Sequence, residues 1–244
     1  MMRFIIITLS VLLILSGISA AAGPKISENG NKHNFSSTNT AVNFRASDED
    51  PRGRQICIFC HTPHFASNEG PLWNRNASPN TFKNFSSATL AIDDAALQVT
   101  ADYGQPTGSS RLCLSCHDGV TAIGALFSAP NIAMANGKDK IGYETYSSHH
   151  PVSFRYNDAV RTLLNAAPYS KNMQPDPPNI YDANVKLDKQ ERMQCTSCHD
   201  PHQDKSDLAG PTTPFWTTTT YESACLSCHN FSGLPGDYPY PWKP

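Results

Sequence analysis

The stretch CTSCHDPH, residues 195–202, places two cysteines three positions apart, follows them at once with a histidine, and adds a second histidine three residues later. The same arrangement occurs as CIFCHTPH at 57–64. Shorter CxxCH motifs, without the second histidine, stand at 113–117 and 225–229, and the four motifs together contain all eight cysteines of the chain. This repeat, more than any pattern of hydrophobic residues, indicates which fold to expect.

The CxxCH spacing is typical of covalent attachment of c-type haem. The two thiols form thioethers with the vinyl groups of the porphyrin, and the adjacent histidine becomes the proximal ligand of the iron. A disulfide framework or a set of zinc ribbons would use the cysteines but would leave the histidine after each pair unexplained. We therefore expect four haem c groups. The expected thioether residues are Cys57, Cys60, Cys113, Cys116, Cys195, Cys198, Cys225 and Cys228, and the expected proximal ligands are His61, His117, His199 and His229.

Five histidines lie outside the CxxCH motifs: His33, His64, His149, His150 and His202. Four irons, each with one open axial position, need four further ligands. His64 cannot ligate the iron of His61, because the two axial ligands lie on opposite faces of the porphyrin and a three-residue link cannot pass around it. By the same argument, each trailing histidine should reach a neighbouring haem, and the proline before it should stiffen the link.

The remaining histidines leave alternatives open. His149 and His150 are either ligands of two different haems, or one ligand and its spare neighbour. His33 lies near the start of the chain and can fold back within its own subunit or reach another one. Methionine is a further possible axial ligand, although the histidines suffice in number.

The composition predicts a fold that is mostly irregular coil with short α-helices and little or no β-sheet. Hydrophobic residues make up 39% of the chain and 19 residues are proline, which favours turns over long helices or strands. Side-chain burial alone would then hardly offset the conformational entropy of the chain, so we expect a stack of haems to form the core and the apoprotein to be largely unfolded. A helix is predicted at 157–168, capped by Asn157 or Asp158, with a weaker one at 87–98 and a short helical turn at each motif.

The N-terminus predicts export. Arg3 precedes an apolar run and small residues extend to Ala22, so residues 1–22 are interpreted as a secretory signal peptide and residues 23–244 as a single tetrahaem domain. The apolar run is short for a retained membrane anchor, and no later segment is apolar enough to span a bilayer. The net charge of −2, without a basic patch, argues against nucleic acid as a partner.

Several stretches resemble multihaem c-type cytochromes of metal-reducing microbes, in particular the OmcE-like group of tetrahaem cytochromes that polymerise into extracellular filaments. These stretches are KHN at 32–34, CIFCHTPH at 57–64, GPLWNR at 70–75, GQPTGSSRLCLSCHDG at 104–119, HPVSF at 150–154, CTSCHDPH at 195–202 and ACLSCH at 224–229. The resemblance implies His33, His64, His150 and His202 as distal ligands, with His149 as the extra histidine and alternative ligand. It also implies a homopolymer in which haems stack across subunit interfaces, with one histidine ligating across a boundary.

The expected function is electron transfer through four bis-histidine haems rather than catalysis. If every iron is six-coordinate, none is free to activate a small molecule. The partners would then be further copies of the chain, other redox proteins or extracellular electron acceptors, and the location would be the cell surface or beyond. The alternatives are a soluble periplasmic tetrahaem shuttle, a multihaem reductase with one open iron, and a purely structural fibre.

Overall fold

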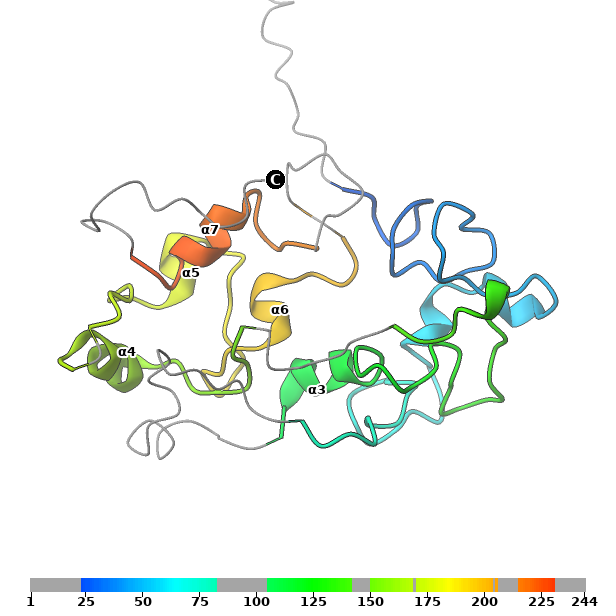
Figure 1. The fold of residues 1–244 in the computed structure, drawn as a ribbon, viewed down its shortest axis with the longest axis horizontal. Coiled ribbons are helices and arrows are strands. Elements are labelled where there is room, and N and C mark those ends of the chain that lie inside the picture. The colour runs from blue at the N-terminus through cyan, green and yellow to red at the C-terminus, as the bar shows by residue number, and fades with distance from the viewer. Residues whose placement is uncertain are drawn as a thin grey trace, which may run out of the picture.

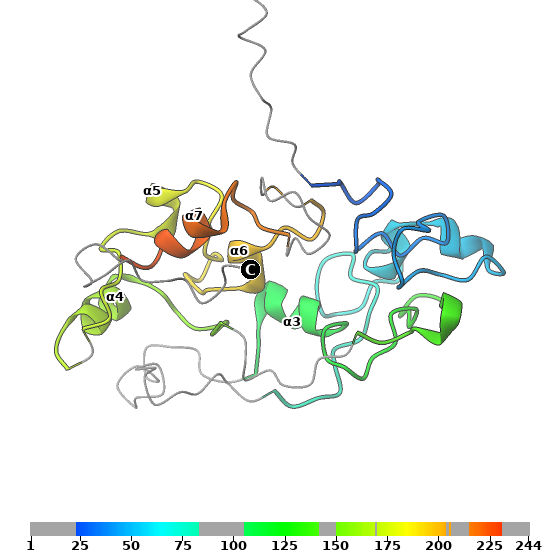
Figure 2. The same cartoon turned by 45° about the horizontal axis from the view of Figure 1, so that its top comes forward.

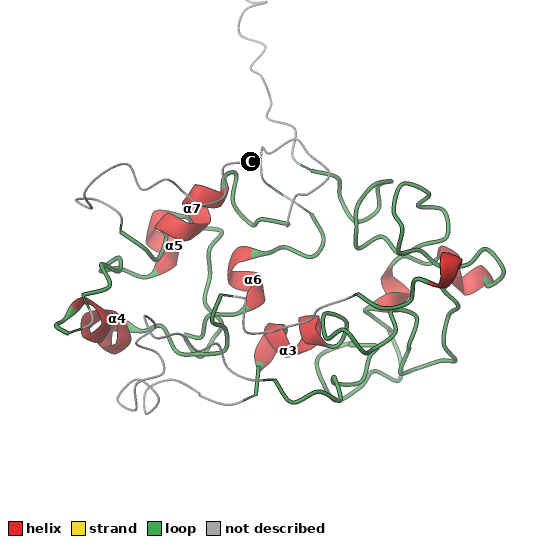
Figure 3. Cartoon of the chain, viewed as in Figure 1, coloured by secondary structure: helices red, strands yellow, loops and turns green. Residues whose placement is uncertain are grey.

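The computed structural model describes residues 23–82, 105–141, 150–168, 170–203, 205 and 215–230, which form short helices joined by long irregular segments (Figure 1). The helices are η1 (Pro51–Arg54), η2 (Cys57–Phe59), α3 (Gly108–Leu114), η4 (Ala135–Gly137), α4 (Asp158–Asn165), α5 (Pro178–Tyr181), α6 (Cys195–Cys198) and α7 (Tyr221–Leu226). Over these residues the chain makes only isolated β-bridges and no strand (Figure 3). The prediction of a coil-rich fold with short helices and without a sheet is confirmed. None of the described helices is long and apolar enough to cross a membrane.

Helix α4 is the helix predicted at 157–168. Asn157 is its N-cap, and the Asn157 side chain accepts a hydrogen bond of 3.1 Å from the backbone N–H of Val160. The helix ends at Asn165, three residues earlier than predicted, because Ala166 already has an extended backbone. The helix expected at 87–98 lies outside the described residues, as does the expected signal peptide at 1–22.

Two small apolar clusters form the interior, one in each half of the chain. The N-terminal cluster consists of Phe35, Ala46, Phe59, Ile123, Leu126 and Ile132. The C-terminal cluster consists of Phe154, Tyr156, Val160, Met173, Met193 and Cys228. Among the described residues, 19 buried polar or charged residues outnumber 15 buried hydrophobic ones. Polar and charged side chains therefore make up the larger share of the buried residues in this part of the chain.

Helices α3 and α6 join the two halves. Figures 1 and 2 both show them side by side near the middle of the molecule, with the blue-to-green half on one side and the yellow-to-red half on the other. The side-chain oxygen of Gln194, the N-cap of α6, accepts a hydrogen bond of 2.6 Å from the hydroxyl of Ser110 in α3. The same hydroxyl accepts a 3.0 Å hydrogen bond from the N–H of Cys195. Gly108 begins α3 with a φ of +54°, and a Cβ there would come within 2.9 Å of the Gln194 amide nitrogen. This close approach favours glycine.

Candidate metal centres

The four CxxCH motifs share one local structure. In motif 1 (57–61), motif 2 (113–117), motif 3 (195–199) and motif 4 (225–229), the histidine N–H donates a hydrogen bond to the carbonyl of the first cysteine, over 2.8, 2.9, 3.0 and 2.9 Å respectively. Each motif is thus a single helical turn, which confirms the predicted turns. Residues three apart on such a turn lie on the same face, so the two thiols of each motif point to one side.

Of the eight motif cysteines, Cys228 is buried, Cys57 is exposed and the other six are partly exposed. Burial raises the pKa of Cys60, Cys198 and Cys228 to about 12 in each case. These thiols are therefore neutral at physiological pH. Within the described residues, no three cysteine, histidine or carboxylate side chains converge in the way that a zinc ribbon requires.

Three motif histidines each face a histidine that lies outside the motifs. The ring centres are 6.1 Å apart for His117 and His33, and 6.4 Å apart for His61 and His202. At motif 4 the ring centre of His229 lies 6.4 Å from that of His150. The partners His33, His150 and His202 are three of the four histidines that the resemblance implies as distal ligands.

These separations fit two imidazoles that share a haem iron. A metal–nitrogen bond of about 2 Å and a distance of about 1.2 Å from nitrogen to ring centre, counted on both sides, give ring centres about 6.4 Å apart. The near-parallel rings of His61 and His202, 6.4 Å apart, are also further apart than the directly stacked rings of His199 and Trp216, which are 4.9 Å apart. The residues present at motifs 1, 2 and 4 therefore fit the group that the sequence predicts, since each motif histidine and its partner histidine are spaced widely enough to hold an iron between them.

Two of the partner histidines are oriented by backbone carbonyls. Nδ1 of His33 donates to the carbonyl of Pro201 over 2.9 Å, and Nδ1 of His150 donates to the carbonyl of Pro151 over 2.8 Å. Because a carbonyl can only accept, the proton lies on Nδ1 and the lone pair on Nε2. Burial lowers the pKa of His33, and burial followed by the charge of His150 lowers the pKa of His229 to about 4. The rings of His33 and His229 are therefore neutral at physiological pH and able to ligate a metal.

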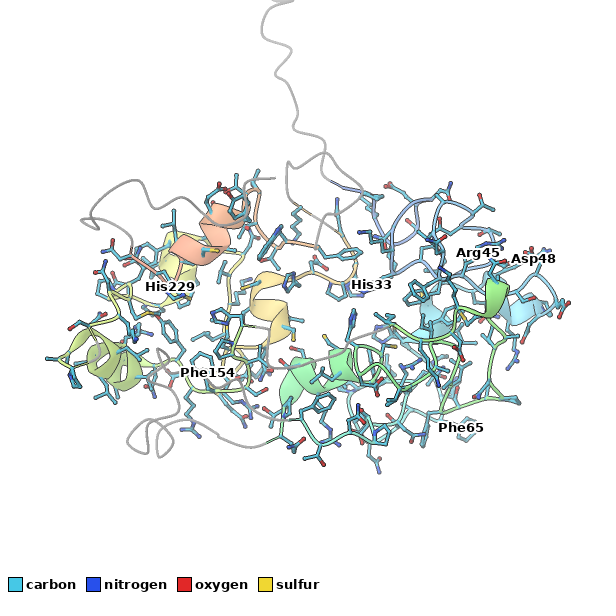
Figure 4. The ribbon with its side chains drawn as sticks, viewed as in Figure 1. His33, Arg45, Asp48, Phe65, Phe154 and His229 are labelled. Atoms are coloured by element: carbon cyan, nitrogen blue, oxygen red, sulfur yellow. The ribbon has the colours of Figure 1, made fainter. Side chains whose placement is uncertain are left out.

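The structure places the other predicted ligands differently. His64 is exposed, its ring faces none of the other described histidines, and its carbonyl accepts a 2.6 Å hydrogen bond from the hydroxyl of Thr62. Phe65, next to it, is 84% exposed and lies at the outer edge of the N-terminal half, far from His229 (Figure 4). His149, the alternative ligand, lies outside the described residues.

The four motifs form one continuous group rather than four separate sites. Burial and then the thiol of Cys116 raise the pKa of Cys60, which places motif 1 against motif 2. Cys113 and Cys195 share a side-chain hydrogen bond that raises the pKa of Cys113, which places motif 2 against motif 3. Burial, and then the thiol of Cys225 in motif 4, raise the pKa of Cys198 in motif 3. Motifs 3 and 4, the closest in sequence, are thus neighbours in space, as expected.

Some residues around the motifs carry no clear signal in the sequence. Asp118, which directly follows motif 2, is buried and accepts hydrogen bonds from Ser78 and the N–H groups of Val120 and Thr121. Burial opposes its ionisation, but these donors outweigh it and lower the pKa of Asp118. Arg75 and Gln194 likewise belong to no sequence motif of known chemistry, because the groups that they hydrogen-bond are distant in the chain.

Compared with known proteins, the chain matches no protein-family profile and no curated sequence. The motifs and their geometry therefore carry the functional argument.

Proposed function

We propose that the protein is a tetrahaem c-type cytochrome that transfers electrons through four covalently attached haems, each ligated by two histidines. The main support is the 6.1–6.4 Å separation between the histidines of motifs 1, 2 and 4 and their partners. When bound, each haem would supply a one-electron ferric–ferrous couple. The contiguity of the four motifs provides a path for electrons from one end of the chain to the other.

The protein's own side chains close the irons to small molecules. His33 and His150, with Nδ1 bound to carbonyls, would present Nε2 to the open face of an iron. At motif 4 the ring that faces His229 is that of His150, which favours histidine over methionine as the second ligand. Two imidazoles give a lower reduction potential than a His/Met pair, and they leave no site for a substrate. We therefore propose electron transfer and not catalysis.

We further propose that His64 ligates an iron in a second copy of the chain, and that the chain is exported after removal of residues 1–22. Support for the first part comes from the exposure of His64 and of the neighbouring Phe65, which together project from the N-terminal half. An apolar residue beside a ligand would bury surface in such a contact. The assembly would be a homopolymer in which haems continue across each subunit boundary.

The attachment of four haems is tested by intact mass and by ligand binding. Protein produced with a cytochrome c maturation system should have the mass of residues 23–244 plus four haems, and the reduced protein, once assembled so that His64 can reach its iron, should not bind carbon monoxide. The matched control, C113S/C116S, should carry three haems. Fewer than four haems in the wild type would contradict the proposal, and prompt binding of carbon monoxide would favour the reductase alternative.

A further inference from the structure

A buried arginine lies between motifs 1 and 2. Arg75 is 1% exposed, and its guanidinium donates hydrogen bonds only to backbone carbonyls. The carbonyls belong to Ser115 (3.2 and 3.1 Å), Ala122 (2.7 Å), Ile123 (2.7 Å), Ala125 (3.0 Å) and Phe59 (3.5 Å). Among the described residues no carboxylate pairs with Arg75, so its positive charge is solvated by the dipoles of backbone carbonyls.

Two of these carbonyls belong to the haem-attachment motifs themselves. Phe59 stands between the two cysteines of motif 1, and Ser115 stands between the two cysteines of motif 2. Each of these two residues directly precedes the second cysteine of its motif, Cys60 or Cys116. The guanidinium therefore lies close to both sites at once.

The second half of the molecule contains a buried arginine in a different electrostatic setting. Arg161 is 4% exposed, and its charge partly offsets the rise that burial causes in the pKa of Cys228 in motif 4. Unlike Arg75, it forms an ion pair with Asp158 and lies 5.5 Å from the ring centre of Tyr156. Its charge is therefore balanced by a carboxylate, whereas that of Arg75 is not. Asp118, near Cys116, is itself engaged by four donors and forms no ion pair with Arg75.

We propose that Arg75 raises the reduction potentials of the haems at motifs 1 and 2, acting through its buried, unpaired charge. The inference rests on the proposed function. Oxidation adds a positive charge to the iron, and a buried cation disfavours this because the low dielectric of the interior screens the repulsion weakly. Removing the charge would leave the oxygen ends of its carbonyl partners near both haems, which would stabilise the ferric state further. Arg75 is a positioning residue, since it touches the motif backbones and not the irons.

The test is a spectroelectrochemical titration of the holoprotein with three variants. Arg75→Met should lower two of the four potentials by about 59 mV or more, a tenfold change in each one-electron equilibrium. Arg75→Lys, titrated at pH 6, retains the charge but loses the forked hydrogen bonds and should keep the wild-type potentials. Arg161→Met, the matched control, should shift at most one haem, and by less, because its charge is already paired.

Each outcome bears on the inference. Unchanged potentials in Arg75→Met, or equal shifts in Arg75→Met and Arg75→Lys, would overturn it, because the second result would indicate a structural effect. If Arg75→Met loads fewer than four haems, Arg75→Lys decides: wild-type potentials support the charge effect and shifted ones contradict it. A wild type that itself lacks four haems would refute the proposed function instead, so the two failures are distinguishable.

Discussion

At the scale of single residues, the three facing histidine pairs differ in the angle between their rings. The planes of His61 and His202 are 17° apart, whereas the other two pairs are at 76° and 75°. When two imidazoles ligate one iron, both planes contain the ligand axis, so this angle is the twist about the iron. The twist sets the splitting of the iron d orbitals and hence the magnetic anisotropy of the ferric state.

This difference predicts two classes of low-spin ferric haem. Near-parallel imidazoles give a rhombic EPR signal, and near-perpendicular ones give a broad signal of large anisotropy. We expect the oxidised holoprotein to show one rhombic component from motif 1 and at least two strongly anisotropic ones, measured at liquid-helium temperature. His202→Ala should remove the rhombic component and leave the others. A single class of signal in the wild type would contradict the assigned pairs.

At the scale of elements, the parts of the fold that the sequence predicts are those set by local contacts. Each motif turn closes through a hydrogen bond from its histidine to the cysteine four residues earlier, so the CxxCH spacing alone predicts it. Helix α4 begins at a cap residue within its own stretch. The pairing of His33 with His117 depends on the path of the intervening chain, and the sequence gives only the count of histidines. Arg75 binds carbonyls, which every residue has, so no motif identifies it.

Gln194 provides a test of how α3 and α6 are joined. Its side-chain oxygen accepts from Ser110, and its side-chain nitrogen donates to Asp188 over 2.9 Å. Gln194→Ala would leave a buried hydroxyl and its neighbours with fewer partners, at a cost of about 1–3 kcal/mol. We expect the free energy of unfolding to fall by this amount in denaturant titrations followed by the haem absorbance. The matched control Gln190→Ala, at an exposed position, should have almost no effect. An equal fall in the free energy of unfolding in both variants would argue against a stabilising contact between α3 and α6 through Gln194.

At the scale of the whole molecule, the described chain has few buried hydrophobic side chains for its size. Its buried residues are more often polar than apolar, and its two apolar clusters are small. Hydrogen bonds in water contribute only about 1 kcal/mol net each, so they hardly offset the entropy of ordering so much irregular backbone. The proposed haems, each attached to residues from different parts of the chain, would supply further stabilisation.

Removal of the haems should therefore unfold the protein. A chain in which all eight cysteines are replaced by serine cannot attach haem, and we expect it to lack a cooperative thermal transition in circular dichroism. The holoprotein should show one. The three-haem variant C113S/C116S should be intermediate, because it loses the cofactor at the junction of α3 with α6. A cooperative transition in the haem-free chain, close to that of the holoprotein, would show that the protein packs without a haem core.

Assembly provides a second prediction at this scale. If His64 ligates an iron in a neighbouring copy, native material viewed by electron microscopy should contain filaments, and His64→Ala should give discrete particles. His149→Ala is the matched comparison, since it alters the alternative ligand. Discrete particles from the wild type would favour the periplasmic shuttle, and intact filaments from His64→Ala would assign the contact to other residues.

The most direct test of the central claim is near-infrared magnetic circular dichroism of the oxidised, assembled holoprotein, which reports the axial ligands of every ferric haem. The account predicts low-spin bands of bis-histidine haem with an intensity equal to four centres per chain. A high-spin centre, or a band from methionine ligation, would contradict it.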